Sequence, residues 1–385
     1  MPASRPSLFR GFRLGEAVAL RSWALRTLAV APAQPPPGCT PGSWAVFLHT
    51  ERCAHPLSQR LARAGIELSP GASAVLRTFA EAELKRVLSV MAQIHPLQAV
   101  ARETGWAIVV MKGGVLAPHP GRAVDVLDLD LLLEHRQARA LAARLDTALG
   151  YVALQPDPHP RAGMAHLAPR VVPNHVLVEV HERVSGLDAP EALLERVEPL
   201  DGAPGLFRLH PRDHLRHLLE HGVRDHPDRR GSLRDLLLVA DAVRRVPDAT
   251  GEPAPAAGGA VAVANLLAMG RALAEGRAPT DAFAAEAAAR YLVAGYVGRW
   301  LAPTKFTRDL GGALAAMVSH PREYAWLWGH TLGRPLGAAS SYRSPVLRYA
   351  AVVGAPALRA TRLLAASVAA VPFVPWARAA AGPRR

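Results

Sequence analysis

The sequence predicts a mixed α/β protein, in which a small mixed β-sheet flanked by helices is followed by a mostly α-helical region. Short apolar segments bounded by Gly or Pro alternate with helical patterns up to about residue 205. Beyond that point apolar residues recur at helical spacing. Hydrophobic residues make up 50% of the 385 residues and charged residues 20%, so the chain can bury a large core.

The elements of the predicted sheet domain follow a regular order. Residues 1–70 are expected to form an N-terminal helical extension with a Pro-rich linker at 32–41. A long amphipathic helix is expected over 72–103 because its apolar residues repeat on one face. The remaining elements expected within a domain spanning 71–205 are a helix at 137–149, ended by Gly150, and strands at 106–111, 126–133, 151–154, 164–168 and 176–181.

The second half of the chain is expected to be helical. A helical domain is predicted over 206–300, followed by a basic helical C-terminal region over 301–385. Residues 296–385 contain twelve basic residues and two acids, a net charge of +10. The expected helices of the helical domain cover 211–222, 233–246, 260–275 and 281–296.

The formal net charge is +13 and the isoelectric point about 10.8, which favours an anionic partner. However, arginine supplies nearly all of the positive charge, and the only lysines are Lys85, Lys112 and Lys305. With so much Ala, Gly and Pro, this composition indicates a GC-rich coding bias, so much of the arginine is expected to be solvated surface. A lysine retained beside a glycine pair, as at Lys112, then becomes a candidate functional residue.

Cysteine content and hydropathy favour a cytoplasmic protein. Two cysteines, Cys39 and Cys53, cannot supply a zinc ligand set alone and do not indicate a disulfide framework. We identify no signal peptide, and no uncharged apolar run reaches the roughly 18–20 residues that span a bilayer. The basic C-terminal region has Phe373 and Trp376 among its arginines. It could contact an anionic membrane surface, bind nucleic acid, or simply expose its arginines to solvent. It contains no recognisable nucleic-acid-binding module.

The residues that carry chemistry lie in three segments of the predicted sheet domain. Lys112-Gly113-Gly114 follows one strand, Asp128 and Asp130 alternate with leucines on the next, and Glu179 lies on a later strand. Side chains two residues apart on a strand point to the same face, so the two aspartates are expected to point together. Paired carboxylates suit a divalent metal ion, and a glycine pair lets backbone N–H groups approach phosphate oxygens.

This arrangement resembles the signature of the DNA polymerase β-like nucleotidyltransferase superfamily, and in particular its uncharacterised bacterial nucleotidyltransferase family. That family has a Lys-Gly turn, an Arg, an Asp-Ile-Asp-Leu-Leu strand and a later Glu-x-His strand. The resemblance covers roughly residues 75–245, although the gap between the arginine and the aspartates is long. The matching segments are Lys112-Gly113-Gly114, Arg122, Asp128 to Leu133, His166 to Pro169 and Val178 to His181.

The resemblance implies transfer of a nucleotidyl group from an NTP to a hydroxyl or phosphate of an unidentified acceptor. The expected group is AMP and the expected donor is ATP, although another NTP could serve. Two Mg²⁺ ions, or Mn²⁺, would be required. Asp128 and Asp130 would bridge both ions, and Glu179 would hold one of them and help deprotonate the acceptor. Gly113 and Gly114 would cradle phosphates, with Lys112 or Arg122 neutralising the leaving pyrophosphate. We expect Asp130→Asn to remove activity with little loss of stability, because the cluster is like-charged.

Histidines provide a second candidate group. Spacings of four, three and four place His210, His214, His217 and His221 on one face of a predicted helix. A zinc site needs convergent ligands from more than one element, so a polar face lining a cleft is the favoured interpretation. His221 matches the histidine of the resembling family best and is expected to face the nucleotide. His181 is either a functional neighbour of the site or a satisfied core histidine.

Two further functions remain open at this point. One is a toxin-like transferase that modifies tRNA or protein. The other is a catalytically silent nucleotide-binding or scaffold protein that keeps the fold. The acceptor, the pathway and the oligomeric state do not follow from the sequence.

Overall fold

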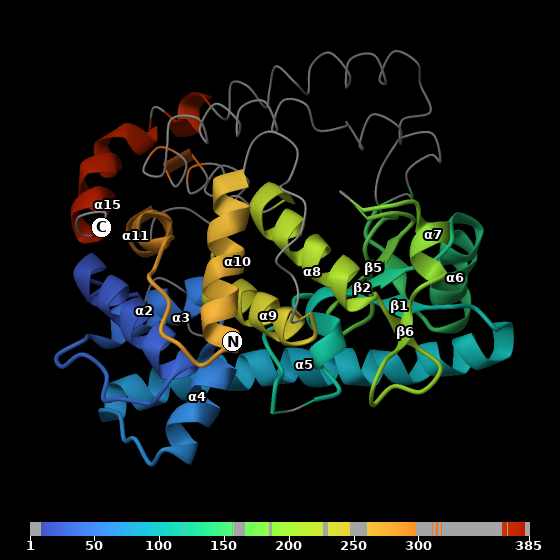
Figure 1. Cartoon of the computed structure of the whole chain (residues 1–385), viewed down its shortest axis with the longest axis horizontal. Coiled ribbons are helices and arrows are strands. Elements are labelled where there is room, and N and C mark those ends of the chain that lie inside the picture. Colours follow the sequence, from blue (N-terminus) through green and yellow to red (C-terminus); the bar gives the residue numbers. More distant parts are fainter. Residues whose placement is uncertain are drawn as a thin grey trace.

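The computed structural model describes residues 9–119, 121–155, 157, 166–184, 187–225, 230–246 and 260–297, and parts of 310–381. It confirms a mixed α/β fold with a seven-stranded sheet beside a large helical region (Figure 1). Strand order is β3-β4-β5-β2-β1-β7-β6. The strands are β1 Val109–Val110, β2 Asp128–Leu132, β3 Val152–Ala153, β4 Arg170–Val171, β5 Leu177–His181, β6 Glu198–Pro199 and β7 Phe207–Arg208.

The centre of the sheet combines both kinds of strand pairing. β2 runs parallel to β5 and antiparallel to β1, and β1 is in turn parallel to β7. Four of the predicted strands are confirmed as β1, β2, β3 and β5, whereas β4, β6 and β7 were not predicted. The strand expected at 164–168 lies partly outside the described residues, and within it His166 forms an isolated bridge with His181.

One face of the sheet is covered by two helices, α5 (Pro70–Thr104) and α6 (His135–Ala148). Their apolar side chains form one core with alternate residues of β2 and β5. Burying each large aliphatic side chain contributes about 1.5–3 kcal/mol, so this alternation fixes the register of both strands and leaves their polar residues on the other face. The strand residues in this core include Leu129, Leu131, Val178 and Val180.

Helices from both ends of the chain share a second core. Figure 1 shows α5 running along one side of the molecule, from the N-terminal helices to the sheet. Arg21 and Glu51, both fully buried, form an ion pair of 2.6 Å, and Arg21 also contacts Asp281 from the later helical region. The N-terminal segment is therefore packed against that region. The helices in this core are α2 (Leu14–Ala29), α3 (Pro41–Glu51), α4 (Ala54–Arg63), α9 (Leu233–Arg244), α10 (Ala260–Ala274) and α11 (Ala284–Leu292).

Two shorter helices flank the other side of the sheet, α7 (Pro190–Leu194) and α8 (Pro211–Glu220). Near the C-terminus, α15 (Val374–Ala381) packs against α11. Phe373 packs on that core, whereas Trp376 is 67% exposed. Most of the basic C-terminal region lies outside the described residues.

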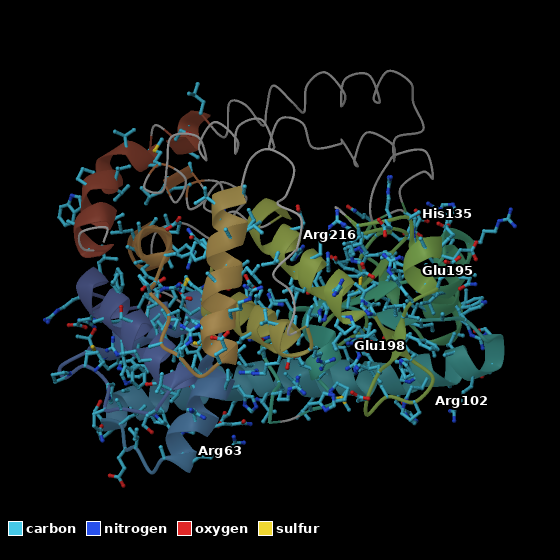
Figure 2. The ribbon with its side chains drawn as sticks, in the orientation of Figure 1. Arg63, Arg102, His135, Glu195, Glu198 and Arg216 are labelled. Atoms are coloured by element: carbon cyan, nitrogen blue, oxygen red, sulfur yellow. The ribbon has the colours of Figure 1, made fainter. Side chains whose placement is uncertain are left out.

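Some arginines of the described chain lie on its surface, whereas others, such as Arg21 and Arg170, are buried. Figure 2 shows Arg63, on α4, and Arg102, on α5, at separate places on the outside of the molecule. None of the described helices combines the length and hydrophobicity needed to span a membrane.

Candidate active site

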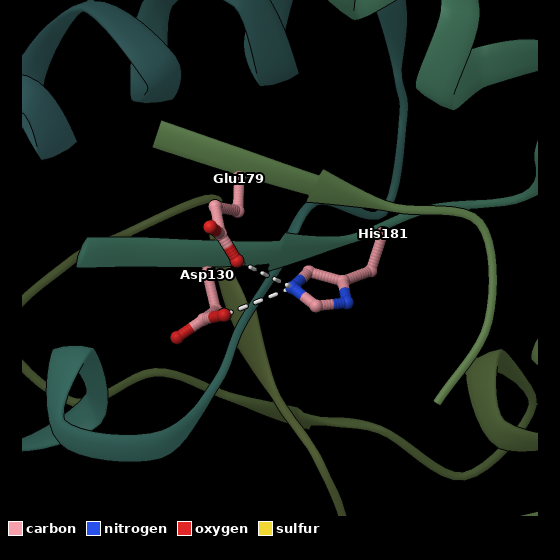
Figure 3. A group of neighbouring side chains, drawn as sticks. All are labelled: Asp130, Glu179 and His181. Atoms are coloured by element: carbon pink, nitrogen blue, oxygen red, sulfur yellow. Dashed lines mark hydrogen bonds and ion pairs between the residues drawn. The ribbon is translucent and has the colours of Figure 1, made fainter. Parts of the chain in front are cut away.

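Asp130 and Glu179 are brought together by the pairing of two neighbouring strands. They are register partners on the parallel strands β2 and β5, so their side chains leave the same face of the sheet. Figure 3 shows the two carboxyl groups converging in front of these strands, with the ring of His181 beside them. Asp128 lies two residues before Asp130 on β2 and shares this face.

Lys112 reaches the same place from the end of β1. The backbone N–H of Met111 donates to the carbonyl of Asp130 at 3.0 Å, which holds the end of β1 against β2. Lys112 follows in a left-handed conformation, with φ of 50°. This turn directs its side chain back over the sheet, and Nζ lies 2.7 Å from Asp130 Oδ1. A strained backbone at a buried charged residue is typical of functional sites.

His181 completes a compact cluster with the two carboxylates. Its Nε2 lies 2.8 Å from Asp130 Oδ1 and 3.8 Å from Glu179 Oε2. One ligand atom from each of Asp130, Glu179 and His181 lies within 4.8 Å of the others. The ring of His166 lies 5.3 Å from that of His181 and favours the charged form of Glu179.

The surroundings move the two carboxyl pKa values in opposite directions. Burial alone would raise the pKa of Asp130, but the Lys112 ammonium and His181 outweigh it and hold this pKa well below its usual range. Burial and the neighbouring Asp130 raise the pKa of Glu179. For Lys112, burial works against the charge, yet Asp130 and Asp128 raise its pKa. Asp130 and Lys112 are therefore a charged pair at neutral pH, and Glu179 is the more basic of the two converging carboxylates.

The glycine pair lies in a tightly packed 3₁₀ turn, Lys112–Leu116. A Cβ on Gly114 would lie 2.8 Å from Val110 Cγ1, and one on Gly113 would lie 3.3 Å from Val126 Cγ2. Close packing against β1 therefore disfavours any larger residue at Gly114, whereas a Cβ at Gly113 would need only a small shift of Val126. Arg234 of α9 approaches the same turn, and it lines a small pocket of about 10 Å³ together with Lys112.

The histidines of α8 divide between two environments. His217 is buried beside Lys112 and Asp130, and burial followed by the neighbouring His221 lowers its pKa well below the usual value. Its Nε2 has no hydrogen-bond partner in the described part of the chain. His221 lines the small pocket with Lys112. His214 hydrogen-bonds the backbone of Lys112 and lies near Arg245 and Arg208; burial together with these arginines lowers its pKa to about 4.

Arg122 lies in a different environment from the carboxylates. It forms an ion pair with Asp241 of α9, and its side chain is 46% exposed. Burial and the nearby Arg245 lower its pKa. Among the described residues, no ion pair or hydrogen bond joins Arg122 to Asp128, Asp130 or Glu179.

The donor set fits a hard divalent cation. Asp130 and Glu179 offer carboxylate oxygens, the ligands that Mg²⁺ and Mn²⁺ prefer, whereas imidazole nitrogen is a better ligand for softer metals. His181 and Lys112 both contact Asp130 Oδ1, and Oδ2 has no donor among the described residues. His181 therefore suits a role in orienting Asp130, with Asp130 Oδ2 and Glu179 as candidate ligands.

Comparison with protein families agrees with this arrangement of residues. The model of a family described as uncharacterised nucleotidyltransferase matches residues 44–273. The chain belongs to this family. The match includes the glycine turn, the strands β2 and β5, and helices α8 and α9. No curated protein and no solved structure matches the chain significantly.

Three residues beside the candidate site were not identified from the sequence as members of it. His166 was noted only within a matching segment, His217 only as one of four histidines on a helix, and Arg234 not at all. The spacing of the α8 histidines could have indicated one face, but not which members reach the carboxylates. Arg234 is 122 residues from Lys112, so no local pattern connects them.

Proposed function

We propose that this chain is a nucleotidyltransferase that moves a nucleotidyl group, AMP from ATP in the first instance, to a hydroxyl or phosphate of an acceptor. The observation that carries the proposal is the pairing of Asp130 with Glu179 on adjacent parallel strands, with Lys112 at 2.7 Å from Asp130. Membership of the nucleotidyltransferase family supports it.

In this reaction the acceptor oxygen forms a bond to the α-phosphorus, and the bond from that phosphorus to the bridging oxygen of pyrophosphate breaks. Asp130, Glu179 and Asp128 would hold Mg²⁺ or Mn²⁺, which neutralises phosphate charge and aligns the reacting oxygens when bound. Glu179 is the better placed carboxylate to accept the proton of an acceptor hydroxyl, because its pKa is raised while that of Asp130 is lowered.

The cations beside the glycine turn have a separate task. Lys112 and Arg234 line one pocket of about 10 Å³, which is too small to hold a phosphate, so their positive charge would act on the oxygens of a triphosphate bound beside it. We expect Lys112 to exchange its contact with Asp130 for a phosphate oxygen when nucleotide binds. Arg122, paired with Asp241, would contribute to the electrostatic field rather than by direct contact.

The experiment is incubation of the full-length protein with each α-³²P-labelled NTP, Mg²⁺ or Mn²⁺, and cell extract. We expect label to pass from one NTP to an acceptor, and Asp130→Asn and Glu179→Gln to abolish the transfer. Nucleotide binding without transfer by any of the four NTPs would contradict the proposal and favour a silent nucleotide-binding protein. Label found on tRNA or on protein would assign the acceptor class of a toxin-like transferase.

A further inference from the structure

The last residue of α3 holds the N-terminus of α9 in place. This residue, Glu51, is fully buried. Its Oε2 accepts from the backbone N–H of Leu233, the first residue of α9, at 2.8 Å, and from Nη1 of Arg21 at 2.6 Å. The first N–H groups of a helix have no partner within the helix and need an acceptor of this kind. The start of α9 is therefore fixed by a side chain of the N-terminal helices.

The second residue of α9, Arg234, reaches the glycine turn. Its Nε donates to the backbone carbonyl of Asp125 at 2.7 Å, and its Nη2 lies 3.8 Å from the place that a Cβ on Gly113 would occupy. It lines the same small pocket as Lys112, whose Nζ lies 2.7 Å from Asp130 Oδ1. The position of the Arg234 guanidinium group therefore depends on where the carbonyl of Asp125 lies.

Asp125 is in turn held by Arg52, which directly follows Glu51. Nε and Nη2 of Arg52 lie 2.6 and 2.5 Å from Asp125 Oδ2, and Nε of Arg86 lies 2.6 Å from Oδ1. Burial would raise the pKa of Asp125, but the neighbouring arginines outweigh it and lower this pKa. Asp125 is therefore a charged, buried carboxylate at neutral pH, and its place is set by the two arginines that contact it.

The backbone of Arg52 is unusual for an arginine. It caps the C-terminus of α3 in the left-handed conformation, with φ of 54° and ψ of 47°. Glycine is the usual residue at such a cap, because a Cβ is strained there. Strain of this kind persists where the surrounding structure needs the side chain. Here the left-handed turn directs the guanidinium group of Arg52 onto Asp125, which gives a physical reason for arginine at this position.

We propose that Arg52 is a positioning residue for nucleotide binding: through Asp125 it holds Arg234 beside the glycine turn, where Arg234 contacts a phosphate of the NTP. The inference rests on the proposed function for the identity of the ligand, but the contacts that hold Arg234 do not. Glu51 fixes the start of α9, and Arg52 fixes the peptide that orients the Arg234 side chain. The N-terminal helices are then part of the nucleotide-binding apparatus and not a separate extension.

The test is calorimetric titration of the full-length protein with Mg²⁺ and the non-hydrolysable NTP analogue that binds the wild type most tightly. We expect Arg234→Ala to weaken binding at least about tenfold, the loss of roughly one charge-assisted hydrogen bond. Arg52→Gly keeps the left-handed turn and should weaken binding at least about threefold. The matched control is Arg60→Ala, which removes an arginine that donates to Thr27 and Val30 within the same N-terminal helices; it should change the affinity less than about twofold.

A double-mutant cycle separates positioning from simple support of the fold. In the Arg234→Ala background, Arg52→Gly should change the affinity less than about twofold, because its effect passes through Arg234. Mn²⁺ binding without nucleotide, followed by electron paramagnetic resonance, should be the same in Arg52→Gly and the wild type. Circular dichroism establishes that each variant is folded, and Arg52→Gln takes the place of Arg52→Gly in the cycle if the glycine variant does not fold.

An equal loss of affinity in both backgrounds, or weakened Mn²⁺ binding, would show that Arg52 only supports the fold and would overturn the proposal. Unchanged nucleotide affinity in Arg52→Gly would overturn it as well. Label transfer by the wild type, together with nucleotide affinity that depends on neither arginine, would leave the proposed function in place and refute the positioning role. A wild type that binds none of the NTP analogues would refute both.

Discussion

The contact between Lys112 and Asp130 can be tested directly by replacing Lys112 with Met, which keeps the length of the side chain and removes its charge. The two side chains are 9% and 1% exposed, so the change leaves a buried carboxylate without its cation. Breaking a buried ion pair by removing one partner costs about 3–5 kcal/mol. Because His181 still contacts Asp130 at 2.8 Å, we expect a value near the lower limit, about 3 kcal/mol.

The assay is urea unfolding followed by circular dichroism, with Lys85→Met as the matched control. Lys85 is exposed, so its replacement should change the free energy of unfolding by less than about 0.5 kcal/mol. The pKa of Asp130 is lowered below its ordinary value of 3.8, and that of Lys112 is raised above 10.5. The contribution of the pair is therefore fully present between these ordinary values. It declines as pH falls through the folded-state pKa of Asp130, or rises through that of Lys112.

The difference between wild type and Lys112→Met should therefore be largest near neutral pH and shrink in acid. A second arm adds Mn²⁺, which should raise the melting temperature of Lys112→Met more than that of the wild type, because the carboxylates have lost a competing cation. A free energy of unfolding within about 0.5 kcal/mol of the wild type at pH 7 would refute the reasoning.

Three further predictions concern other parts of the molecule. Asp130→Asn should abolish transfer and lower the free energy of unfolding by about 3 kcal/mol in urea titrations, because Lys112 is left buried without its partner. Glu83, whose pKa burial raises to about 7, gives stability that is greatest below its ordinary pKa of 4.5 and is lost as pH rises through 7. Glu83→Gln should flatten that dependence in unfolding experiments, and an unchanged slope would exclude Glu83 as its source. Truncation after Tyr342 should lower the melting temperature, because α15 packs on α11; an unchanged melting temperature together with lost binding to anionic vesicles would support a membrane role instead.

The convergence of the carboxylates could be predicted because it depends on local rules. Side chains repeat every two residues on a strand, so Asp128 and Asp130 had to share a face, and the apolar alternation of β5 placed Glu179 on the polar side. The long helix α5 was equally predictable from its repeating apolar face. The strands β4, β6 and β7 were missed because each has only two residues and one or both of them are charged or proline, whereas the equally short β1 and β3 consist of apolar residues.

The neighbours of the carboxylates depend on tertiary structure and could not be predicted. The left-handed conformation of Lys112 directs its ammonium onto Asp130, which no sequence pattern indicates. The expectation that Asp130→Asn would cost little stability treated the cluster as purely negative, and this buried lysine reverses it. His217 lies beside the Asp130 carboxylate while His214 contacts the backbone of Lys112, because the rotation of α8 about its axis is set by packing.

Positional labelling of ATP tests the central claim most directly. Purified protein is incubated with Mg²⁺, acceptor-containing extract, and ATP labelled with ³²P on either the α- or the γ-phosphate, in parallel with Asp130→Asn. The account predicts that the wild type transfers α-label and not γ-label, with pyrophosphate as the other product, and that Asp130→Asn transfers neither. Transfer of γ-label, or α-label transfer that persists in Asp130→Asn, would contradict nucleotidyl transfer at the Asp130–Glu179 pair.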